Sequence, residues 1–457
     1  MTPRQTRTWT ARPPEGLRPL PKLAPVADDP LNRVAQYLGL SMLFLTFSVL
    51  PQIIGYVTGV NFFLLYLIGV PALLATVLSG GLRRSFRGRP AYYWTGFACW
   101  MLIATPFSSW PGGSAAGCLD YWKSSLIMLF IVAGLIFEWR DVKKVMTVIA
   151  VAGVVDLFIV RMFRLDSSSR VALSFGTIGN SNDYAAHLLL VMPFLLWIAL
   201  TGKLVLRIGA ALCLAAGLYL ILATASRGAL VSLAVDALAV AILGTARQRI
   251  GLALIGPLAA VILLATVPTE ALQRMSTVWN KSISTAQAAS AGESADAREY
   301  VLRTSIRYTF EHPLFGVGLR EFANYEGRHE QVIGGVRGYW HETHNSYTQV
   351  ASECGIPALL LFASGIISTF LLLRKTLKEA RRRPGCQDIR NAVFCILLGM
   401  IGFCTAITFL SFAYYFYLPA LGGLATGVWF AAQREFQRRD ELLQVAPIRN
   451  PVVNLRR

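Results

Sequence analysis

Charged residues are scarce in this chain. Only 15% of its 457 residues are charged, whereas an ordinary soluble domain carries about 25%. Hydrophobic residues make up 54% of the chain and mean hydropathy is +0.51. Repeated apolar segments of near-spanning length account for this bias. The composition therefore excludes an ordinary soluble protein and predicts an all-α polytopic membrane protein.

Several kinds of chemistry also lack their residues. The seven cysteines are scattered and form no CxxC pair, which argues against a zinc knuckle or a disulfide framework. There is no P-loop lysine and no GxSxG, and Gly316-Val317-Gly318 is too short for a dinucleotide loop. His341 and His344 have the wrong spacing for HExxH, and no carboxylate pair stands out on the outer side. We expect neither a metal nor a cofactor.

The apolar segments suggest about twelve spans and five regions. Residues 1–33 have no apolar core and are expected to form a disordered cytoplasmic tail rather than a signal peptide. Spans one to nine are assigned to 34–268, a long outer loop to 269–352, spans ten to twelve to 353–432 and a basic tail to 433–457. The twelve expected spans are 34–54, 59–79, 91–107, 124–138, 144–163, 184–201, 204–223, 227–244, 249–268, 353–373, 390–410 and 412–432.

The net charge of +18 reflects topology rather than nucleic-acid binding. The basic residues form short clusters between apolar segments, as at 83–89, 140–144 and 374–383. Such clusters mark cytoplasmic loops, and no basic stripe forms on a soluble face. We therefore expect both termini in the cytoplasm, membrane lipids as neighbours and no nucleic-acid partner.

Several arginines are expected on the outer side of the membrane. Arg227 lies between two apolar segments, where it either snorkels to the interface or faces a polar cavity. Neighbouring Ser226 and Gly228 suggest close backbone approach, which favours the cavity. The long loop adds further arginines whose planar guanidinium groups suit phosphate oxygens, although each could instead lie on a solvated face. They are Arg298, Arg303, Arg307 and Arg320, of which Arg303 and Arg307 could pair with Glu299 and Glu311.

The same loop contains a helical segment at 298–311. Leu302, Ile306 and Phe310 share one face of it, and His312-Pro313 should end it.

The run that starts at His344 closes the long loop and enters an apolar segment. A histidine at a membrane–water boundary, beside the hydrogen-bonding Asn345, can take a proton from an alcohol near neutral pH. If residues 344–353 form one helix, Glu353 lies on the opposite face and is a poor partner for His344. We expect Glu353 to cap or pack at the helix entry.

A second polar segment lies at 176–184. Its glycines and its Asn and Asp residues predict a tight loop ending in a helix N-cap. Contact with sugar hydroxyls is the functional alternative for Asn180, Asn182 and Asp183.

Together these residues resemble the O-antigen ligase and polymerase superfamily of bacterial envelope glycosyltransferases (GT-C type), over roughly residues 170–375. The resemblance rests on Gly179-Asn180-x-Asn182-Asp183, on Ser226-Arg227-Gly228, and on Arg298 followed by 312–318, His344-Asn345 and Glu353-x-Gly355. Thr348 and Ala358 stand where the family usually has Leu and Gly, at helix-packing positions.

The resemblance implies a function. The donor would be a glycan on undecaprenyl pyrophosphate, passed with inversion and without metal to an acceptor hydroxyl, on lipid A core or another glycan. Arg227 and Arg298 would bind the pyrophosphate and His344 would activate the acceptor; all three are expected to be catalytic. Substrate contacts are expected from Asn345, Arg303, Arg320, Asn180, Asn182 and Asp183.

Other functions remain open. Within the superfamily, a polysaccharide polymerase or a ligase that glycosylates protein would share this donor. From another class, a transporter of lipid-linked sugars predicts ionisable residues in mid-span, and Asp156 and Asp236 are the main ones. The resemblance places the protein in the bacterial inner membrane, with its site at the periplasmic face.

Overall fold

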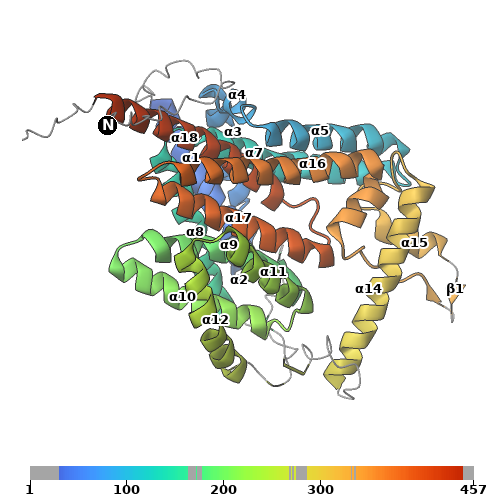
Figure 1. Ribbon diagram of the computed structural model, residues 1–457. Coiled ribbons are helices and arrows are strands. Elements are labelled where there is room, and N and C mark those ends of the chain that lie inside the picture. Colours follow the sequence, from blue (N-terminus) through green and yellow to red (C-terminus); the bar gives the residue numbers. More distant parts are fainter. Residues whose placement is uncertain are drawn as a thin grey trace, which may run out of the picture.

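The chain is almost entirely helical (Figure 1). The structure, a computed structural model, describes residues 30–162, 171, 178–266, 269, 272–273, 286–330, 332–333 and 336–445. The predicted all-α fold is confirmed, with one small addition. Two strands of two residues each, β1 (Val332–Ile333) and β2 (Val336–Arg337), pair antiparallel in the long loop.

The described elements follow one another along the chain in this order. The N-terminal half contains α1 (Pro30–Phe47), α2 (Leu50–Thr58), α3 (Leu64–Leu78), α4 (Gly81–Ser85), α5 (Arg89–Ala104), the 3-10 turn η1 (Thr105–Phe107), α6 (Pro111–Asp120), the π-helical η2 (Tyr121–Leu126), α7 (Ile127–Gly134), α8 (Trp139–Met162), α9 (Ser181–Thr201) and α10 (Leu204–Ala223). The C-terminal half contains α11 (Arg227–Leu243), α12 (Ala246–Thr266), α14 (Ala286–Glu311), α15 (Phe322–His329), α16 (Ser346–Arg382), α17 (Gln387–Ala406), η4 (Ile407–Phe409) and α18 (Tyr417–Val445).

Each expected span coincides with a helix or with a consecutive pair of helices. Six of the described helices are long and apolar enough to cross a bilayer, or seven if α1 and α2, bent by 63°, count as one span. A count of about twelve is therefore not confirmed. The six are Pro111–Gly134, α8, α9, α10, Ser346–Arg382 and Gln387–Phe409. Residues 1–29 of the expected disordered tail lie outside the described residues. Residues 30–33, which were assigned to the same tail, belong to α1, which begins at Pro30.

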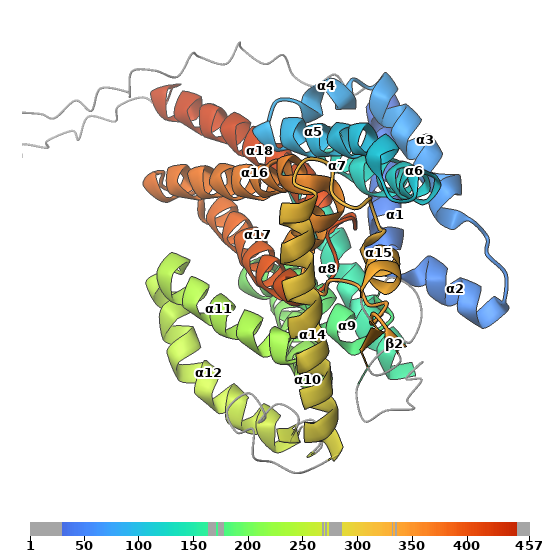
Figure 2. The ribbon, with the colours of Figure 1, turned by 90° about the vertical axis from the view of Figure 1, so that its right-hand side faces the viewer.

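The long loop forms a cap over one end of the helix bundle. Helix α14 stands upright beside that end in Figure 1, and Figure 2 looks straight onto it, with α15 and β2 close by. As predicted, α14 ends at Glu311, just before His312-Pro313. The Leu302, Ile306 and Phe310 face does not enter the core, since the Ile306 and Phe310 side chains are 43% and 73% exposed. The buried face carries Val301 and Tyr308 instead.

A fully buried polar cluster joins three helices inside the bundle. Nε2 of His187 on α9 lies 2.9 Å from Oδ2 of Asp156 on α8, and its Nδ1 lies 3.0 Å from the hydroxyl of Tyr417 on α18. All three side chains are almost completely inaccessible to solvent. Polar groups in such a place must pair with one another. Asp156, which the sequence offered as a transport residue, thus has a structural partner.

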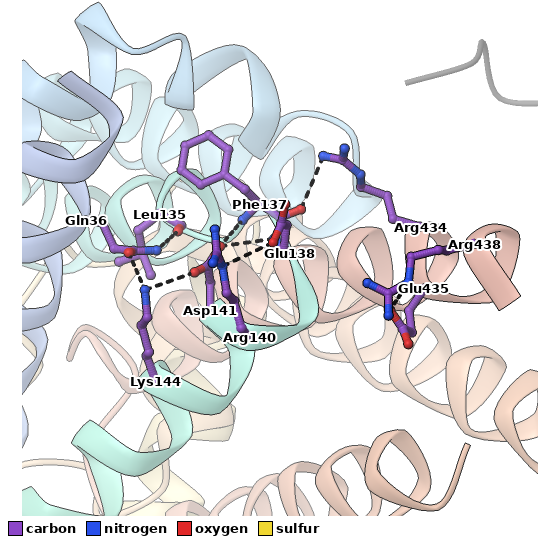
Figure 3. A network of polar contacts seen from close by, with 10 residues as sticks. All are labelled: Gln36, Leu135, Phe137, Glu138, Arg140, Asp141, Lys144, Arg434, Glu435 and Arg438. Carbon is purple, nitrogen blue, oxygen red and sulfur yellow. Dashed lines mark hydrogen bonds and ion pairs between the residues drawn. The ribbon is translucent and has the colours of Figure 1, made fainter. Parts of the chain in front are cut away.

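A polar network lies around the start of α8 (Figure 3). The carboxylate of Asp141 accepts the backbone N–H groups of Phe137 and Glu138 and so satisfies donors at the start of α8. Lys144 donates to Asp141 and to Gln36 of α1, over 3.3 and 2.6 Å. The network ties α1 to the connection between α7 and α8.

Candidate functional site

The first site element is the N-terminus of α9. Oδ1 of Asn180 accepts the N–H groups of Asn182 and Asp183 over 2.9 and 3.0 Å. Nδ2 of Asn180 donates to the Asp183 carboxylate over 2.5 Å. The predicted N-cap is confirmed. Asn180 and Asp183 therefore shape this helix end, whatever else they bind.

The second element is the tight turn between α10 and α11. Ala225 adopts a φ of 51°, and the Ser226 hydroxyl caps α11 by accepting the N–H of Ala229. Arg227 is thus the first residue of α11. Any side chain at Gly228 would press on the ring of Phe409, within 2.9 Å of it. The close backbone approach expected around Ser226 and Gly228 is confirmed.

Arg298 of α14 completes a small pocket with these two elements. Its lining combines Asn182 from α9, Ser226 and Gly228 from the turn, and Phe409 from η4. Residues more than a hundred positions apart in the sequence therefore meet at one place. Arg227 begins its helix between two of the lining residues.

His344 lies beside this pocket, and contacts of its own backbone hold it in place. Its φ of 49° places a non-glycine residue in the left-handed region, which costs about 1 kcal/mol or more. Its N–H donates to Oγ of Ser411 over 3.0 Å. Next along the chain, the Ser346 hydroxyl donates to the carbonyl of Leu410 over 2.7 Å. These two contacts fix the backbone that carries the imidazole.

The surroundings of His344 keep it neutral. Burial, the positive charge of Arg298 and the nearby His341 lower the pKa of His344 from its usual 6.5 to about 4. The rings of His341 and His344 are 6.4 Å apart. A neutral imidazole has a nitrogen that can accept a proton. At pH 7 the side chain is therefore neutral.

Asn345, the neighbour of His344, has a structural role. Its Oδ1 accepts the N–H groups of Tyr347 and Thr348 over 2.9 and 3.1 Å and caps α16. The helix accordingly begins at Ser346, two residues later than the run that starts at His344.

The glycine-rich segment 312–318 docks on the first turns of α16. The N–H groups of Val317 and Gly318 donate to the carbonyls of Ser352 and Glu353, over 2.8 and 3.0 Å. Gly355 breaks the helix with a φ of 84° and a ψ of 173°. A Cβ there would collide with the carbonyl of Leu314, so this position requires glycine.

Glu353 packs at this junction rather than beside His344. Its side chain is 4% exposed and accepts the N–H of Arg320 over 2.9 Å. The expectation that Glu353 packs at the helix entry is confirmed. It helps to hold the docked segment against α16.

Two other loop arginines are occupied by acids. Arg303 pairs with Glu299 on the exposed side of α14, and Arg320 pairs with Asp120 of α6 over 2.9 Å. The structure brings neither into the pocket that holds Arg298.

Sequence reasoning missed Ser411, Glu326 and His187. Ser411 holds the His344 backbone. The buried Glu326 accepts the N–H groups of Tyr339 and Trp340 and so shapes the chain leading to His341. A lone serine or glutamate gives no signal in sequence, because both contacts are between distant segments. His187 had a signal, since a histidine inside an apolar segment needs a partner.

Within the described residues, no group of three His, Cys, Asp or Glu side chains is placed to hold a metal ion.

Comparison with known proteins bears on this site. Residues 210–363, about a third of the chain, match the family described as O-Antigen ligase. The resemblance to the O-antigen ligase and polymerase superfamily is thereby confirmed. The match includes Arg227, Arg298, the docked segment and His344, whereas the α9 N-cap lies before it. No curated protein matches the chain.

Proposed function

We propose that this membrane protein, whose residues 210–363 match the O-antigen ligase family, moves a glycan from undecaprenyl pyrophosphate to an acceptor hydroxyl. One observation carries the proposal. Arg298 lines a pocket with the Arg227 turn, and its charge also acts on His344. The two arginines that would bind a diphosphate therefore lie near the histidine that would take a proton from a hydroxyl.

Each group has a defined task in the proposed reaction. Neutral His344 accepts the proton of the acceptor hydroxyl as its oxygen attacks the anomeric carbon. The bond from that carbon to the pyrophosphate oxygen breaks on the opposite face, which inverts the configuration. Undecaprenyl pyrophosphate leaves with the bonding electrons, and Arg227 and Arg298 stabilise its growing negative charge.

The donor makes this chemistry feasible without a metal or a nucleotide. Pyrophosphate is a good leaving group once its charge is balanced, and arginines in a partly dry pocket balance charge strongly. A positioned base adds about 10²–10⁴-fold in rate. Asn182, at the wall of the same pocket, is placed to bind a sugar hydroxyl.

We place this site at the periplasmic face of a bacterial inner membrane. The basic clusters near 83–89 and 374–383 lie at the other end of the bundle, where the positive-inside rule puts the cytoplasm. Both termini would then be cytoplasmic.

The decisive experiment follows lipid-linked glycans in cells that lack this protein. Full-length polymer stranded on the polyprenyl carrier, with bare lipid A core, identifies a ligase. Single repeat units stranded on the carrier identify the alternative, a polysaccharide polymerase. An unchanged glycan pattern contradicts both.

Site variants test the mechanism. His344→Ala, Arg298→Ala and Arg227→Ala are expected to lower transfer by about 10²-fold or more, with normal protein in the membrane. His329→Ala is the matched control, because His329 lies exposed on α15. Full transfer by the His344 variant would rule out its role as a base.

A further inference from the structure

Two groups of cations lie at the end of the bundle opposite the site, and their partners differ. The first group is paired with acids. Arg140 contacts Glu138 over 3.1 Å and Lys143 contacts Asp388 over 2.7 Å. Figure 3 shows Arg140 with Glu138, and Arg438 with Glu435. These cations are largely neutralised within the protein.

The second group is not. Arg87, Arg89 and Lys375 are all exposed and form no ion pair with any described residue. Other cations lie near Arg87 instead. The guanidinium of Arg87 lies 4.2 Å from the centre of the Phe430 ring, and that of Arg434 lies 5.8 Å from the same ring. Burial, Arg434 and Arg83 lower the pKa of Arg87, as expected where positive charge accumulates without an anion.

These three cations line one cavity of about 480 Å³ between α5, α16 and α18. The cavity extends from the charged end toward the middle of α16, where it meets Ile367 and Leu371. Both side chains are more than half exposed. The indole Nε1 of Trp429, also in the lining, is buried without a hydrogen-bond acceptor. The cavity thus offers cations at one end and an apolar wall at the other.

Its depth in the membrane follows from α16. Between Gly355 and Arg374 the helix carries no charged residue, a length of about 27 Å at 1.5 Å per residue. The hydrocarbon core of a bilayer is about 30 Å thick. Lys375 therefore lies at the membrane–water boundary opposite the site, while Ile367 and Leu371 lie within the hydrocarbon.

We propose that this cavity binds an anionic phospholipid of that leaflet. Its phosphate lies among Arg87, Arg89 and Lys375, and its acyl chain runs along Ile367 and Leu371. Arginine suits phosphate oxygens, and basic pockets between transmembrane helices bind acidic lipid headgroups. An inorganic phosphate would use the cations but leave the apolar wall exposed. The site is independent of glycan transfer.

The test compares two variants of equal charge change in the full-length protein. Arg87→Gln/Arg89→Gln/Lys375→Gln removes the unpaired cations, and Arg140→Gln/Lys143→Gln/Arg438→Gln removes acid-paired ones. Each protein is purified in detergent, mixed with phosphatidylglycerol or phosphatidylcholine, and examined by native mass spectrometry. We expect at least tenfold weaker phosphatidylglycerol retention in the first variant alone, and little phosphatidylcholine retention in any protein.

Several outcomes would overturn the proposal. These are equal loss in both variants, retention of both lipids alike, or release of bound lipid by millimolar inorganic phosphate, which would indicate a simple anion site. If the triple variant does not fold, Lys375→Gln replaces it, with Lys143→Gln as its control. Unchanged lipid retention in Lys375→Gln would then count against the site.

Discussion

The two ends of α16 are held by different kinds of contact. At the site end, Asn345 caps the helix, and the carbonyls of Ser352 and Glu353 accept N–H groups from the docked segment 312–318. At the other end, α16 carries exposed basic residues such as Arg374 and Lys375. Backbone hydrogen bonds fix positions, whereas exposed charges adjust and are screened by salt. The site end should therefore tolerate far less change than the charged end.

Gly355→Ala should break the site end most severely. The new Cβ would meet Leu314 in a backbone conformation that only glycine adopts readily. We expect a stability loss of about 3 kcal/mol or more and loss of transfer, measured by thermal unfolding in detergent and by glycan assay. Gly209→Ala in α10 is the control, since no atom lies within 4 Å of its added Cβ. Equal stability of both variants would contradict the docking argument.

Ser411→Ala removes the acceptor of the His344 N–H. Loss of one such bond costs about 1 kcal/mol, so we expect at most roughly a fivefold decrease in kcat and little change in melting temperature. Ser368→Ala is the matched control, because its hydroxyl bonds only within α16. If both variants keep full kcat, the backbone bond does not position His344.

His341→Gln should shift the pH dependence of transfer. The folded pKa of His344 is about 4 because of burial, Arg298 and His341. Since the base must be neutral, kcat/KM should stay level from pH 8 to about pH 5 and fall as His344 gains a proton. Removing the His341 charge raises the pKa of His344, so the acid limb should move to higher pH, by less than one unit. A limb that stays in place would show that His341 does not act on His344.

The same pKa shift affects stability. The unfolded chain binds a proton at His344 near pH 6.5, whereas the folded chain does so only near pH 4. Between these values the unfolded state holds more protons, so stability falls as the pH drops through this window.

Arg303→Ala should have the smallest effect. Arg303 and Glu299 are exposed partners on one face of α14, and such pairs contribute less than about 1 kcal/mol. Transfer should remain within twofold of the unaltered protein. A tenfold loss of transfer with normal folding would instead support the prediction from sequence that Arg303 contacts the substrate.

Local patterns in the sequence predicted most of the helices. Apolar length located the segments, the Asn180 pattern predicted a cap, and His312-Pro313 predicted the end of α14. These features depend on residues within a few positions of one another. The number of spans was harder to predict. Several helices are close to the limit of length or apolar character that a membrane-crossing helix needs.

The candidate site could be predicted only in part. The position of Arg298 beside the Arg227 turn rests on resemblance, since no local pattern brings α14 to α11. The break at Gly355 was missed because Leu314, which packs against it, lies 41 positions earlier in the chain. The periodicity of Leu302, Ile306 and Phe310 predicted a helix but not which of its faces is buried, and Ile306 and Phe310 are in fact exposed.

The buried His187 cluster constrains how the protein is assembled. Asp156 and His187 belong to α8 and α9, which are synthesised early, whereas Tyr417 belongs to α18, the last of the described helices. Until α18 arrives, Nδ1 of His187 has no tyrosine to bond, and polar groups exposed to lipid are costly. A chain that stops before position 417 would leave this nitrogen unsatisfied within the membrane. The hydrogen bonds of this buried cluster are therefore complete only when residues from both parts of the chain are in place.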